Sequence, residues 1–473
     1  MSKVNYDAQQ WAESVFGQAE LGDSRRTQRL IKVGEMLASH TGSSPLQASE
    51  GKVALSEGAY RLIRNDAVDV NEIAESGFAA TVRQASDYEE LLALEDTTSL
   101  SYAHRVTSEL GDLGGKVDSP KRGYIVHSVL LVAPQNDSIV GLLDQQRWCR
   151  DPAKRGQRHA NKSRDYEDKE SYKWQSAAER IAQRLGEQGS RVIAVCDREA
   201  DIYEYLSYKT DNAQRYIVRA ARDRKLDDEE DKLFACVAQT PELGKYTIPL
   251  QQRGGPQGRP ARKACLSVRS ASVTLHPPKR MTDELVPLTV NAVLAQECHP
   301  PKGQDSLCWL LLTSEPVGNL RAAQKVLQAY ALRWRIEDFH KAWKSGTRVE
   351  HRRMQTADNL ERMAVILAFV AVRLLQLREG LHPVDKQHGR PCTDVLEPIQ
   401  WRLLWVTTEK NKPPHKVPSQ QWAYYAIAKL GGWMDTKGTG RVGWEALWRG
   451  WFRLTERVEA YVSARDLLDD VDL

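Results

Sequence analysis

Three acidic residues stand where they could share a metal ion. Asp96 follows a short apolar run at residues 91–94, Asp197 follows another at residues 191–196, and Glu337 lies in a later stretch with helical spacing. A carboxylate at the end of a buried strand lies at the rim of a sheet, where ligands bind in α/β folds. Carboxylate oxygens are the ligands that Mg²⁺ prefers, so these three residues can hold two such ions.

This arrangement would act on a phosphodiester. Two metal ions about 3.5 to 4 Å apart activate the attacking oxygen and stabilise the leaving oxygen when a phosphoryl group is displaced in line. Acidic residues at sheet rims are common, however, so their number alone is a weak signal. The residues around Glu337 have to supply the specificity.

The stretch at residues 330–344, YALRWRIEDFHKAWK, is predicted to be the helix that positions Glu337. At about 100° per residue, one arc of about 60° collects a carboxylate among groups that bind phosphate. Its members are Tyr330, Arg333, Glu337 and Lys344. The face predicted to pack on a core consists of Ala329, Leu332, Ile336, Phe339 and Trp343. Taken alone, the pattern also fits an ordinary amphipathic helix with a solvated charged side. The two aspartates favour the functional interpretation.

The composition indicates an ordered globular protein of two or three domains, because 473 residues suffice for a sizeable core. The longest apolar run, residues 363–372, is too short to span a bilayer, and the polar N-terminus shows no signal-peptide pattern. We therefore expect a cytoplasmic protein with no membrane partner. Seven scattered cysteines argue against a disulfide framework or a zinc ribbon. A net charge of +4 does not by itself indicate a nucleic-acid partner.

Residues 1–70 are predicted to form a small helical unit. Its second helix can be capped by Asp23 or Ser24, and its apolar stripe consists of Leu30, Val33 and Leu37. Four cations lie away from that stripe, namely Arg25, Arg26, Arg29 and Lys32. They favour a DNA-facing helix, although four cations on one helix also fit an ordinary solvated face.

The middle of the chain is predicted to alternate strands and helices. Two strands at residues 124–133 and 138–143 should form an antiparallel meander with the run that leads to Asp96. A helix at residues 167–187 buries Trp174, Ala178, Ile181 and Leu185, and a strand follows at residues 216–220. Residues 147–164 carry seven basic residues against one acid. That segment is either a nucleic-acid contact or a solvated loop, and its role stays open.

The last part divides into a β-rich and a helical region. Residues 238–315 are predicted to be a β insertion whose second basic surface consists of Arg253, Arg259, Arg262, Lys263 and Arg269. A long apolar helix at 359–376 and a Pro-rich stretch at 380–419 follow. The C-terminal helices contain Trp422, Trp433, Trp444, Trp448 and Trp451. An exposed aromatic interaction face is the preferred interpretation, with core packing as the alternative.

Several motifs resemble the bacterial cut-and-paste transposases of the insertion-sequence-four family. They include LEDTTSL around Asp96, AVCDREAD around Asp197, and the Y-(2)-R-(3)-E-(6)-K spacing at residues 330–344. The similarity runs along essentially the whole chain, through WAESVF, LGDSRRTQRL, EGAYRLIRN, VHSVLL, RPARKA, HPPKG, WLLLTSEP, DNLERM and VAVRLLQLRE. Residues 145–170 depart from the pattern, because a basic run replaces a more acidic stretch.

The resemblance implies an α/β fold, with a ribonuclease-H-like mixed sheet, a β-rich insertion, and helical domains at both ends. Residues 1–70 would bind transposon-end DNA, residues 71–370 would form the catalytic domain with its insertion at about 238–315, and residues 371–473 would dimerise. It also implies that Asp96, Asp197 and Glu337 bind Mg²⁺, with Mn²⁺ as a substitute and two ions in each active site.

The resemblance further implies a set of DNA contacts. Tyr330, Arg333 and Lys344 would contact the DNA backbone near the cut, and Arg219 and Asn359 match further family contacts. Trp309 matches an aromatic residue that receives a flipped base when a hairpin forms. A tryptophan in the core of the sheet is the alternative for that position.

The expected function is a DNA transposase that works as a homodimer on transposon ends and target DNA, and that associates with the nucleoid when bound. It would nick each end, form and reopen a hairpin, and join the ends to target DNA. A structure-selective nuclease on the same fold is one rival, and a non-catalytic regulator that occupies transposon ends is another. The three acids favour an enzyme over the regulator, and the residues flanking Glu337 favour a transposase over a plain nuclease.

Overall fold

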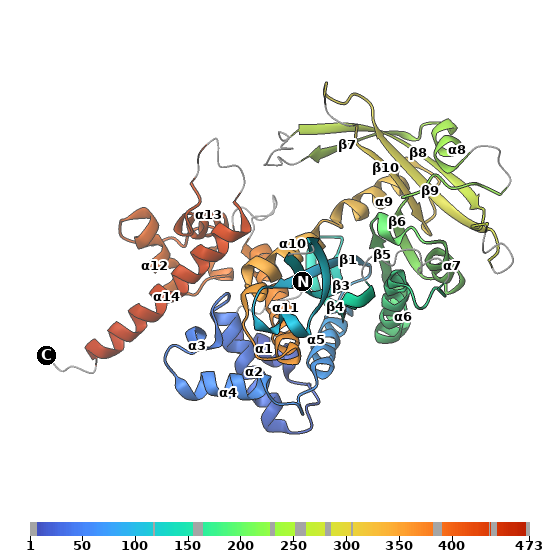
Figure 1. The fold of residues 1–473 in the computed structure, drawn as a ribbon. Coiled ribbons are helices and arrows are strands. Elements are labelled where there is room, and N and C mark those ends of the chain that lie inside the picture. The colour runs from blue at the N-terminus through green and yellow to red at the C-terminus, as the bar shows by residue number, and fades with distance from the viewer. Residues whose placement is uncertain are drawn as a thin grey trace. The chain divides into compact units, whose positions relative to one another are not determined.

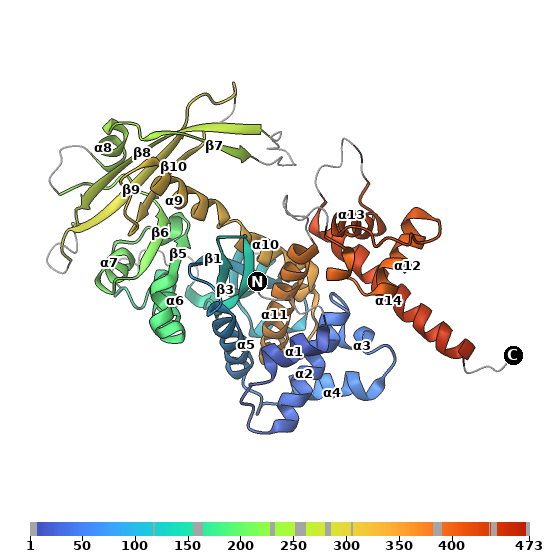
Figure 2. The same cartoon turned by 180° about the vertical axis from the view of Figure 1, so that it is seen from behind.

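The computed structural model describes residues 7–469 except 117–118, 155–163, 228–231, 251–261, 280–284, 304–305, 382–389, 435 and 437–441. The chain divides into two compact units, one formed by Gly77–Asp338 and the other by Met1–Ser76 together with Phe339–Leu473 (Figure 1 and Figure 2). No helix among the described residues is long and apolar enough to cross a membrane. The predicted division into three functional domains stays a prediction.

The Gly77–Asp338 unit is built on one ten-stranded sheet in the order β2-β3-β1-β5-β6-β10-β9-β8-β7, with β4 also paired to β3. The strands are β1 (Leu91–Tyr102), β2 (Gly111–Lys116), β3 (Ser119–Ala133), β4 (Ser138–Trp148), β5 (Val192–Cys196), β6 (Arg215–Arg219), β7 (Gly244–Leu250), β8 (Arg262–Leu275), β9 (Leu288–Glu297) and β10 (Cys308–Thr313). The predicted meander is confirmed, because β3 pairs antiparallel with β1 and with β4. On its other side β1 pairs parallel with β5, and β5 pairs parallel with β6. This mixed α/β sheet confirms the predicted ribonuclease-H-like fold class.

Helices complete this unit: α5 (Val70–Ala85), α6 (Lys173–Leu185), α7 (Tyr203–Asp211), α8 (Leu233–Gln239) and α9 (Leu320–Leu332). The predicted stripe of α6 is confirmed, since Trp174, Ala178, Ile181 and Leu185 are all buried. All five residues of β5 are buried as well. Because both faces of β5 are covered, its residues are apolar throughout, and no polar side chain occurs at residues 192–196 before Asp197.

The β-rich region extends the central sheet. β10 pairs antiparallel with β6 and with β9, so the strands of the predicted insertion continue the sheet that carries the aspartates. Of the predicted second basic surface, Arg253 and Arg259 lie outside the described residues. Two other members have protein partners, because Arg262 pairs with Glu297 and Arg269 donates to the Thr240 carbonyl oxygen.

The other unit is helical, and its described helices include α1 (Ala8–Phe16), α2 (Ser24–Ser39), α3 (Pro45–Ala48), α4 (Val53–Ile63), α11 (Ala357–Leu381), α12 (Pro398–Glu409), α13 (Gln420–Leu430) and α14 (Trp444–Asp469). Asp23 caps α2 as predicted, by accepting a hydrogen bond from the Arg25 backbone N–H at 2.8 Å. Buried arginines of α11 tie it to the N-terminal helices. Arg362 donates to the carbonyl oxygens of Ile63 and Val68 at 3.0 and 2.8 Å.

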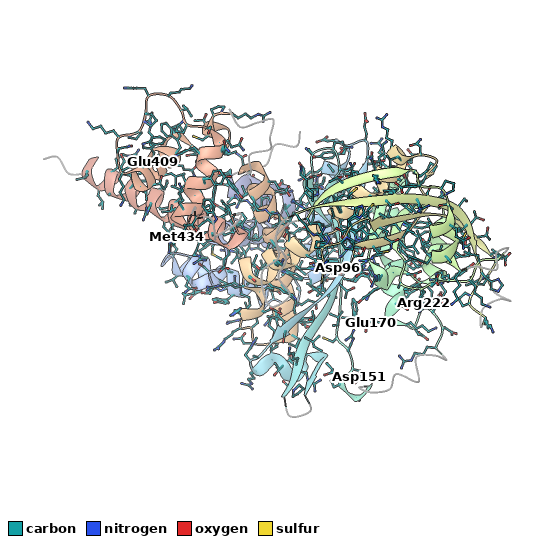
Figure 3. The ribbon with its side chains drawn as sticks, turned by 90° about the horizontal axis from the view of Figure 1, so that it is seen from above. Asp96, Asp151, Glu170, Arg222, Glu409 and Met434 are labelled. Atoms are coloured by element: carbon teal, nitrogen blue, oxygen red, sulfur yellow. The ribbon has the colours of Figure 1, made fainter. Side chains whose placement is uncertain are left out.

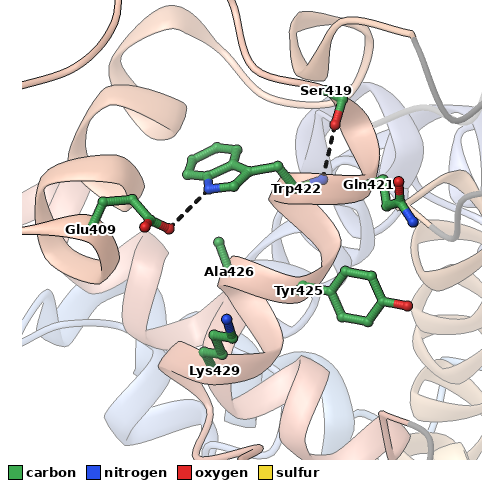
Figure 4. A pocket seen from close by; sticks show the side chains of 7 residues that line it. All are labelled: Glu409, Ser419, Gln421, Trp422, Tyr425, Ala426 and Lys429. Carbon is green, nitrogen blue, oxygen red and sulfur yellow. Dashed lines mark hydrogen bonds between the residues drawn. The ribbon is translucent and has the colours of Figure 1, made fainter. Parts of the chain in front are cut away.

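The C-terminal tryptophans pack mainly against the core of their own region. Trp448 is buried, and Trp422, Trp433 and Trp451 are partly buried against the cluster formed by α12, α13 and α14. The predicted exposed tryptophan face is therefore wrong for these four residues, because their rings pack against buried apolar side chains of neighbouring helices. A pocket of about 310 Å³ lies beside Trp422, whose indole N–H donates to Glu409 Oε1 at 3.0 Å (Figure 4).

Candidate active site

Asp96 lies inside β1 rather than after it, which corrects the predicted strand end. The antiparallel ladder with β3 continues to Tyr102, whereas the parallel ladder with β5 covers only Leu91 to Leu94. Pairing with β3 therefore extends β1 beyond Leu94. The apolar run at residues 91–94 does not reveal this pairing. Relative to β5, Asp96 still lies just beyond the end of the parallel pairing, as predicted.

The two aspartates share one face and one end of the parallel strand pair. Leu94 and Val195 are register partners, and Asp96 and Asp197 each follow two residues later. Side chains two residues apart on a strand point to the same face. Figure 3 labels Asp96 in the view from above. The prediction that these carboxylates meet at one edge is therefore consistent with the register.

One oxygen of each aspartate is held by a nearby backbone N–H. Asp96 Oδ1 accepts from Thr97 N, and Asp197 Oδ1 accepts from Glu199 N, both at 2.8 Å. The second contact caps the short 3₁₀ turn Arg198–Ala200. Both carboxylates are thereby oriented by the turn or strand in which they lie.

The predicted continuous helix at 330–344 is wrong. The helix α9 ends at Leu332, a turn at residues 333–334 follows, α10 spans Arg335–Lys341, and a π-helical turn covers Ala342–Gly346. At the turn the backbone N–H groups of Ile336 and Glu337 bond to residues three positions earlier, at 3.2 and 3.1 Å. A break without glycine or proline points to tertiary forces, and here the buried side chain of Arg333 supplies one.

Arg333 joins the acidic residues. Its guanidinium lies 3.8 Å from Asp96 Oδ2 (Nη1) and 3.3 Å from Glu337 Oε1 (Nη2), and its side chain is only 9% exposed. Burial opposes the charged form, but Tyr330, Asp96, Asp197 and Glu337 together raise the pKa of Arg333. Arg333 was predicted to contact DNA, whereas in this structure its contacts are with the carboxylates.

The pKa of Asp96 reports the strain in this cluster. The pKa of Asp96 is raised from 3.8 to about 6, mainly by burial; the Thr97 N–H and Arg333 oppose the rise, and the negative charges of Asp197 and Glu337 add to it. Three carboxylates and one guanidinium leave an excess of negative charge. A hard divalent cation, which takes carboxylate oxygens and relieves their repulsion, fits this donor set.

The three acids do not form a closed ligand cage. Among the described residues, the one group of three or more His, Cys, Asp or Glu residues whose ligand atoms all lie within 4.8 Å is His40, Glu50 and Glu459. The active-site acids thus lie close enough for their charges to affect one another, but their ligand atoms do not all lie within 4.8 Å of one another.

The remaining predicted residues of this unit are mostly buried. Tyr330 is 3% exposed and Trp309 8% exposed, and their rings meet edge to face at a centroid distance of 5.2 Å. Arg219 donates to the Cys308 carbonyl oxygen at 3.0 Å. Trp334, which the sequence analysis did not single out, is 57% exposed and lies under the Arg333 guanidinium at 5.2 Å. At about 100° per residue Trp334 falls opposite the predicted core face of residues 329–343, so the helical pattern could have indicated its exposure.

Lys344 and Asn359 belong to the other unit. Lys344 lies in the π-helical turn and is partly buried. Asn359 lies in the first turn of α11, is 7% exposed, and accepts a hydrogen bond from Arg362 at 3.0 Å. Their predicted DNA contacts stay predictions.

The four N-terminal cations divide into two kinds. Arg25 and Lys32 are exposed on α2. Arg26 donates to the carbonyl oxygens of Leu21 and Ala67 at 2.9 and 3.2 Å. Arg29 lies so close to Gly58 that a Cβ there would be 2.3 Å from its guanidinium. Arg25 and Lys32 are thus the two whose side chains are exposed to solvent, and Arg25 also pairs with Asp23 at 2.9 Å.

The basic segment at 147–164 is described only at its ends, since residues 155–163 lie outside the described residues. Arg150 at its start forms a bidentate pair with Glu170, at 2.7 and 2.5 Å. Figure 3 labels Glu170 together with Asp151 of this segment. Its role stays open.

Comparison with known protein families gives two matches. Residues 8–68 match the transposase DNA-binding family, and these residues contain α1 to α4 and the four cations of α2. Residues 145–373 match the transposase DDE domain, which includes Asp197 and Glu337. Asp96 precedes the matched stretch and is linked to it by the register of β1 and β5. By these two matches the chain belongs to the DDE transposases.

Proposed function

We propose that the protein is a cut-and-paste DNA transposase of the insertion-sequence-four type, with motifs similar to those of the transposase of transposon five. It would nick each transposon end, use the freed 3′-OH to form a hairpin, reopen the hairpin with water, and join the ends to target DNA. All four steps displace a phosphoryl group with different nucleophiles, so one set of residues can serve them.

The observation that carries this proposal is the charge cluster just beyond the end of the parallel pairing of β1 and β5. Asp96, Asp197 and Glu337 would hold Mg²⁺ or Mn²⁺, two ions in each site. The bound metal would activate the attacking oxygen and stabilise the leaving oxygen. The Thr97 and Glu199 N–H groups orient the aspartates, and Arg333 keeps Asp96 and Glu337 in one charge environment.

DNA would be held by groups around this cluster and by the N-terminal helices. Arg25 and Lys32 are exposed on α2 and would contact phosphates of the transposon end. Arg333 could exchange a carboxylate for a phosphate once a cation is bound, because a guanidinium pairs with either. Trp309 would receive a flipped base, and Trp334 offers a second, exposed aromatic face beside Arg333. The C-terminal helices would join two subunits on paired ends.

Glu337→Ala tests this proposal. The full-length variant would be assayed in Mg²⁺ on an uncut transposon end and on a pre-cut end with a free 3′-OH. We expect both nicking and strand transfer to be lost while end binding persists. Glu187→Ala, which removes an exposed acid from the 3₁₀ turn that follows α6 in the same unit, is the matched control and should behave as wild type. Near wild-type strand transfer or nicking by Glu337→Ala would remove Glu337 from the shared site.

A further inference from the structure

A polar cluster is buried on the face of β1 opposite to Asp96. Glu95 and His127 have no exposed surface, and Thr97 is partly buried. Residues 95 and 97 point to the other side of the strand from residue 96. His127 is the register partner of Thr97 on β3. Burying a carboxylate and an imidazole without full compensation costs free energy. Their presence beside Asp96 therefore suggests that they have a function.

His127 bridges the other two residues. Its Nδ1 lies 3.0 Å from Thr97 Oγ1, and its Nε2 lies 3.3 Å from Glu95 Oε2. With Glu95 as a carboxylate, which only accepts hydrogen bonds, Nε2–H is the donor and Nδ1 accepts from the Thr97 hydroxyl. The Trp174 ring packs against the imidazole at a centroid distance of 4.6 Å. These contacts hold the orientation of the His127 ring.

Thr97 connects this cluster to the active site. Its hydroxyl is held by His127 on one face of β1, while its backbone N–H donates to Asp96 Oδ1 on the other. Asp96 Oδ1 is therefore occupied, and Asp96 Oδ2 is the oxygen that faces the Arg333 guanidinium at 3.8 Å.

We propose that His127 and Glu95 are positioning residues for Asp96 and act through Thr97. They fix Thr97 so that its N–H stays on Asp96 Oδ1 and leaves Oδ2 for the cation. This inference rests on the proposed role of Asp96 as a metal ligand. Groups that orient a metal-binding side chain typically change metal affinity by about 10- to 100-fold when they are removed.

The test compares two substitutions of Thr97 in the full-length protein. Thr97→Val keeps the shape and the backbone N–H but removes the hydroxyl, whereas Thr97→Ser keeps the hydroxyl. Mn²⁺ binding is followed by electron paramagnetic resonance, and nicking is measured against metal concentration. We expect Thr97→Val to need roughly 10-fold more Mn²⁺ for half-saturation in both assays, and Thr97→Ser to remain within about 2-fold of wild type.

Ser99→Ala is the matched control, because it removes a hydroxyl two residues further along the same face of β1. Its Mn²⁺ affinity should be that of wild type. Wild-type Mn²⁺ affinity in Thr97→Val would overturn the proposal. Failure of Thr97→Val to fold would overturn it too, since the role would then be structural.

Two more variants separate this inference from the proposed function. His127→Gln should weaken Mn²⁺ binding as Thr97→Val does, and the double variant should lose little more than either single one, because both remove the same link. Additive losses would contradict the link. Asp96→Asn should lose Mn²⁺ binding outright. If Asp96→Asn binds Mn²⁺ like wild type, the proposed function fails. If it loses binding while Thr97→Val does not, only the positioning role fails.

Discussion

Two clusters of acidic side chains differ in what surrounds them. His40, Glu50 and Glu459 have ligand atoms within 4.8 Å of one another, with His40 Nε2 3.0 Å from Glu50 Oε1 and 3.8 Å from Glu459 Oε1. The side chains of Glu50 and Glu459 are 46% and 42% exposed. In the active-site cluster, Asp96 is 21% exposed and Glu337 33% exposed, but the acids are less tightly gathered.

The difference indicates that short distances between ligand atoms do not by themselves identify a metal site. In the cluster around His40, the imidazole lies against both glutamates. Burial, followed by the neighbouring Glu50, raises the pKa of Glu459, which favours a shared proton. The active-site acids have one arginine for three carboxylates, and they lie in β1 (Asp96), directly after β5 (Asp197) and in α10 (Glu337). In that cluster a cation would relieve the excess of negative charge.

The largest effect is expected from Asp96→Asn. Loss of a metal-binding carboxylate removes several kcal/mol of charge stabilisation, so nicking should fall by about 1000-fold or more. End binding should persist in a mobility-shift assay. Nicking within about 10-fold of wild type would place Asp96 outside the metal site.

The same substitution should change stability in the opposite direction. The pKa of Asp96 is raised to about 6 in the folded protein, so wild-type stability falls as pH rises through 6 and is fully present only below about 4. In metal-free buffer at pH 8, Asp96→Asn should therefore be more stable by up to about 3 kcal/mol. The gain should vanish near pH 4 in denaturant titrations. A destabilised variant at pH 8 would contradict the strained cluster.

Arg333→Gln should have an intermediate effect. Arg333 favours the ionised form of Asp96, so its removal raises the pKa of Asp96 further and moves the acid limb of the nicking profile to higher pH by about one unit. Nicking at pH 8 should fall roughly 10-fold, because a charge-assisted contact is lost. Arg321→Gln on the exposed side of α9 is the control. An acid limb that stays in place would show that Arg333 does not tune Asp96.

Substitutions of Trp309 and Trp334 should affect different properties of the protein. Trp309→Ala should slow hairpin formation roughly 10-fold more than nicking if Trp309 stacks on a base, since stacking contributes about 1 to 3 kcal/mol. Equal losses in both steps, with a lowered melting temperature, would identify a core residue. Trp334→Ala, at an exposed position, should leave the melting temperature within about 2 °C of wild type.

The smallest effect is expected from the cluster around His40. Glu459→Gln removes a partly exposed charge, so stability should change by less than about 1 kcal/mol. The Mn²⁺ dependence of nicking should match wild type within about 2-fold. A changed Mn²⁺ dependence would mean that the cluster around His40 also contributes to metal-dependent nicking.

Local patterns in the sequence predicted many of the strands and helices that position Asp96 and Asp197. The apolar run at 192–196 predicted β5 and the place of Asp197, and the stripe of α6 predicted its buried face. These features depend on neighbouring residues, so periodicity reveals them. The length of β1 was not predictable, because pairing with β3 prolongs it through residues of mixed polarity.

The site itself depends on contacts between distant residues. The break at residues 333–334 contains no glycine or proline, and it accompanies a buried arginine that reaches Asp96, which lies far away in the sequence. The link from His127 to Thr97 depends on the register of β3 against β1. Neither feature leaves a local signal. The burial of Trp448 likewise follows from packing between helices rather than from its neighbours in sequence.

The central claim is that the three carboxylates bind the catalytic metal, and Asp197→Cys tests it most directly. A thiolate is a poor ligand for Mg²⁺ and a better one for the softer Mn²⁺. The variant, on an uncut transposon end, should be inactive in Mg²⁺ and regain at least about 10-fold in nicking rate when Mn²⁺ replaces Mg²⁺, beyond any gain of wild type. The same ratio of Mn²⁺ to Mg²⁺ activity in variant and wild type would show that Asp197 does not contact the metal.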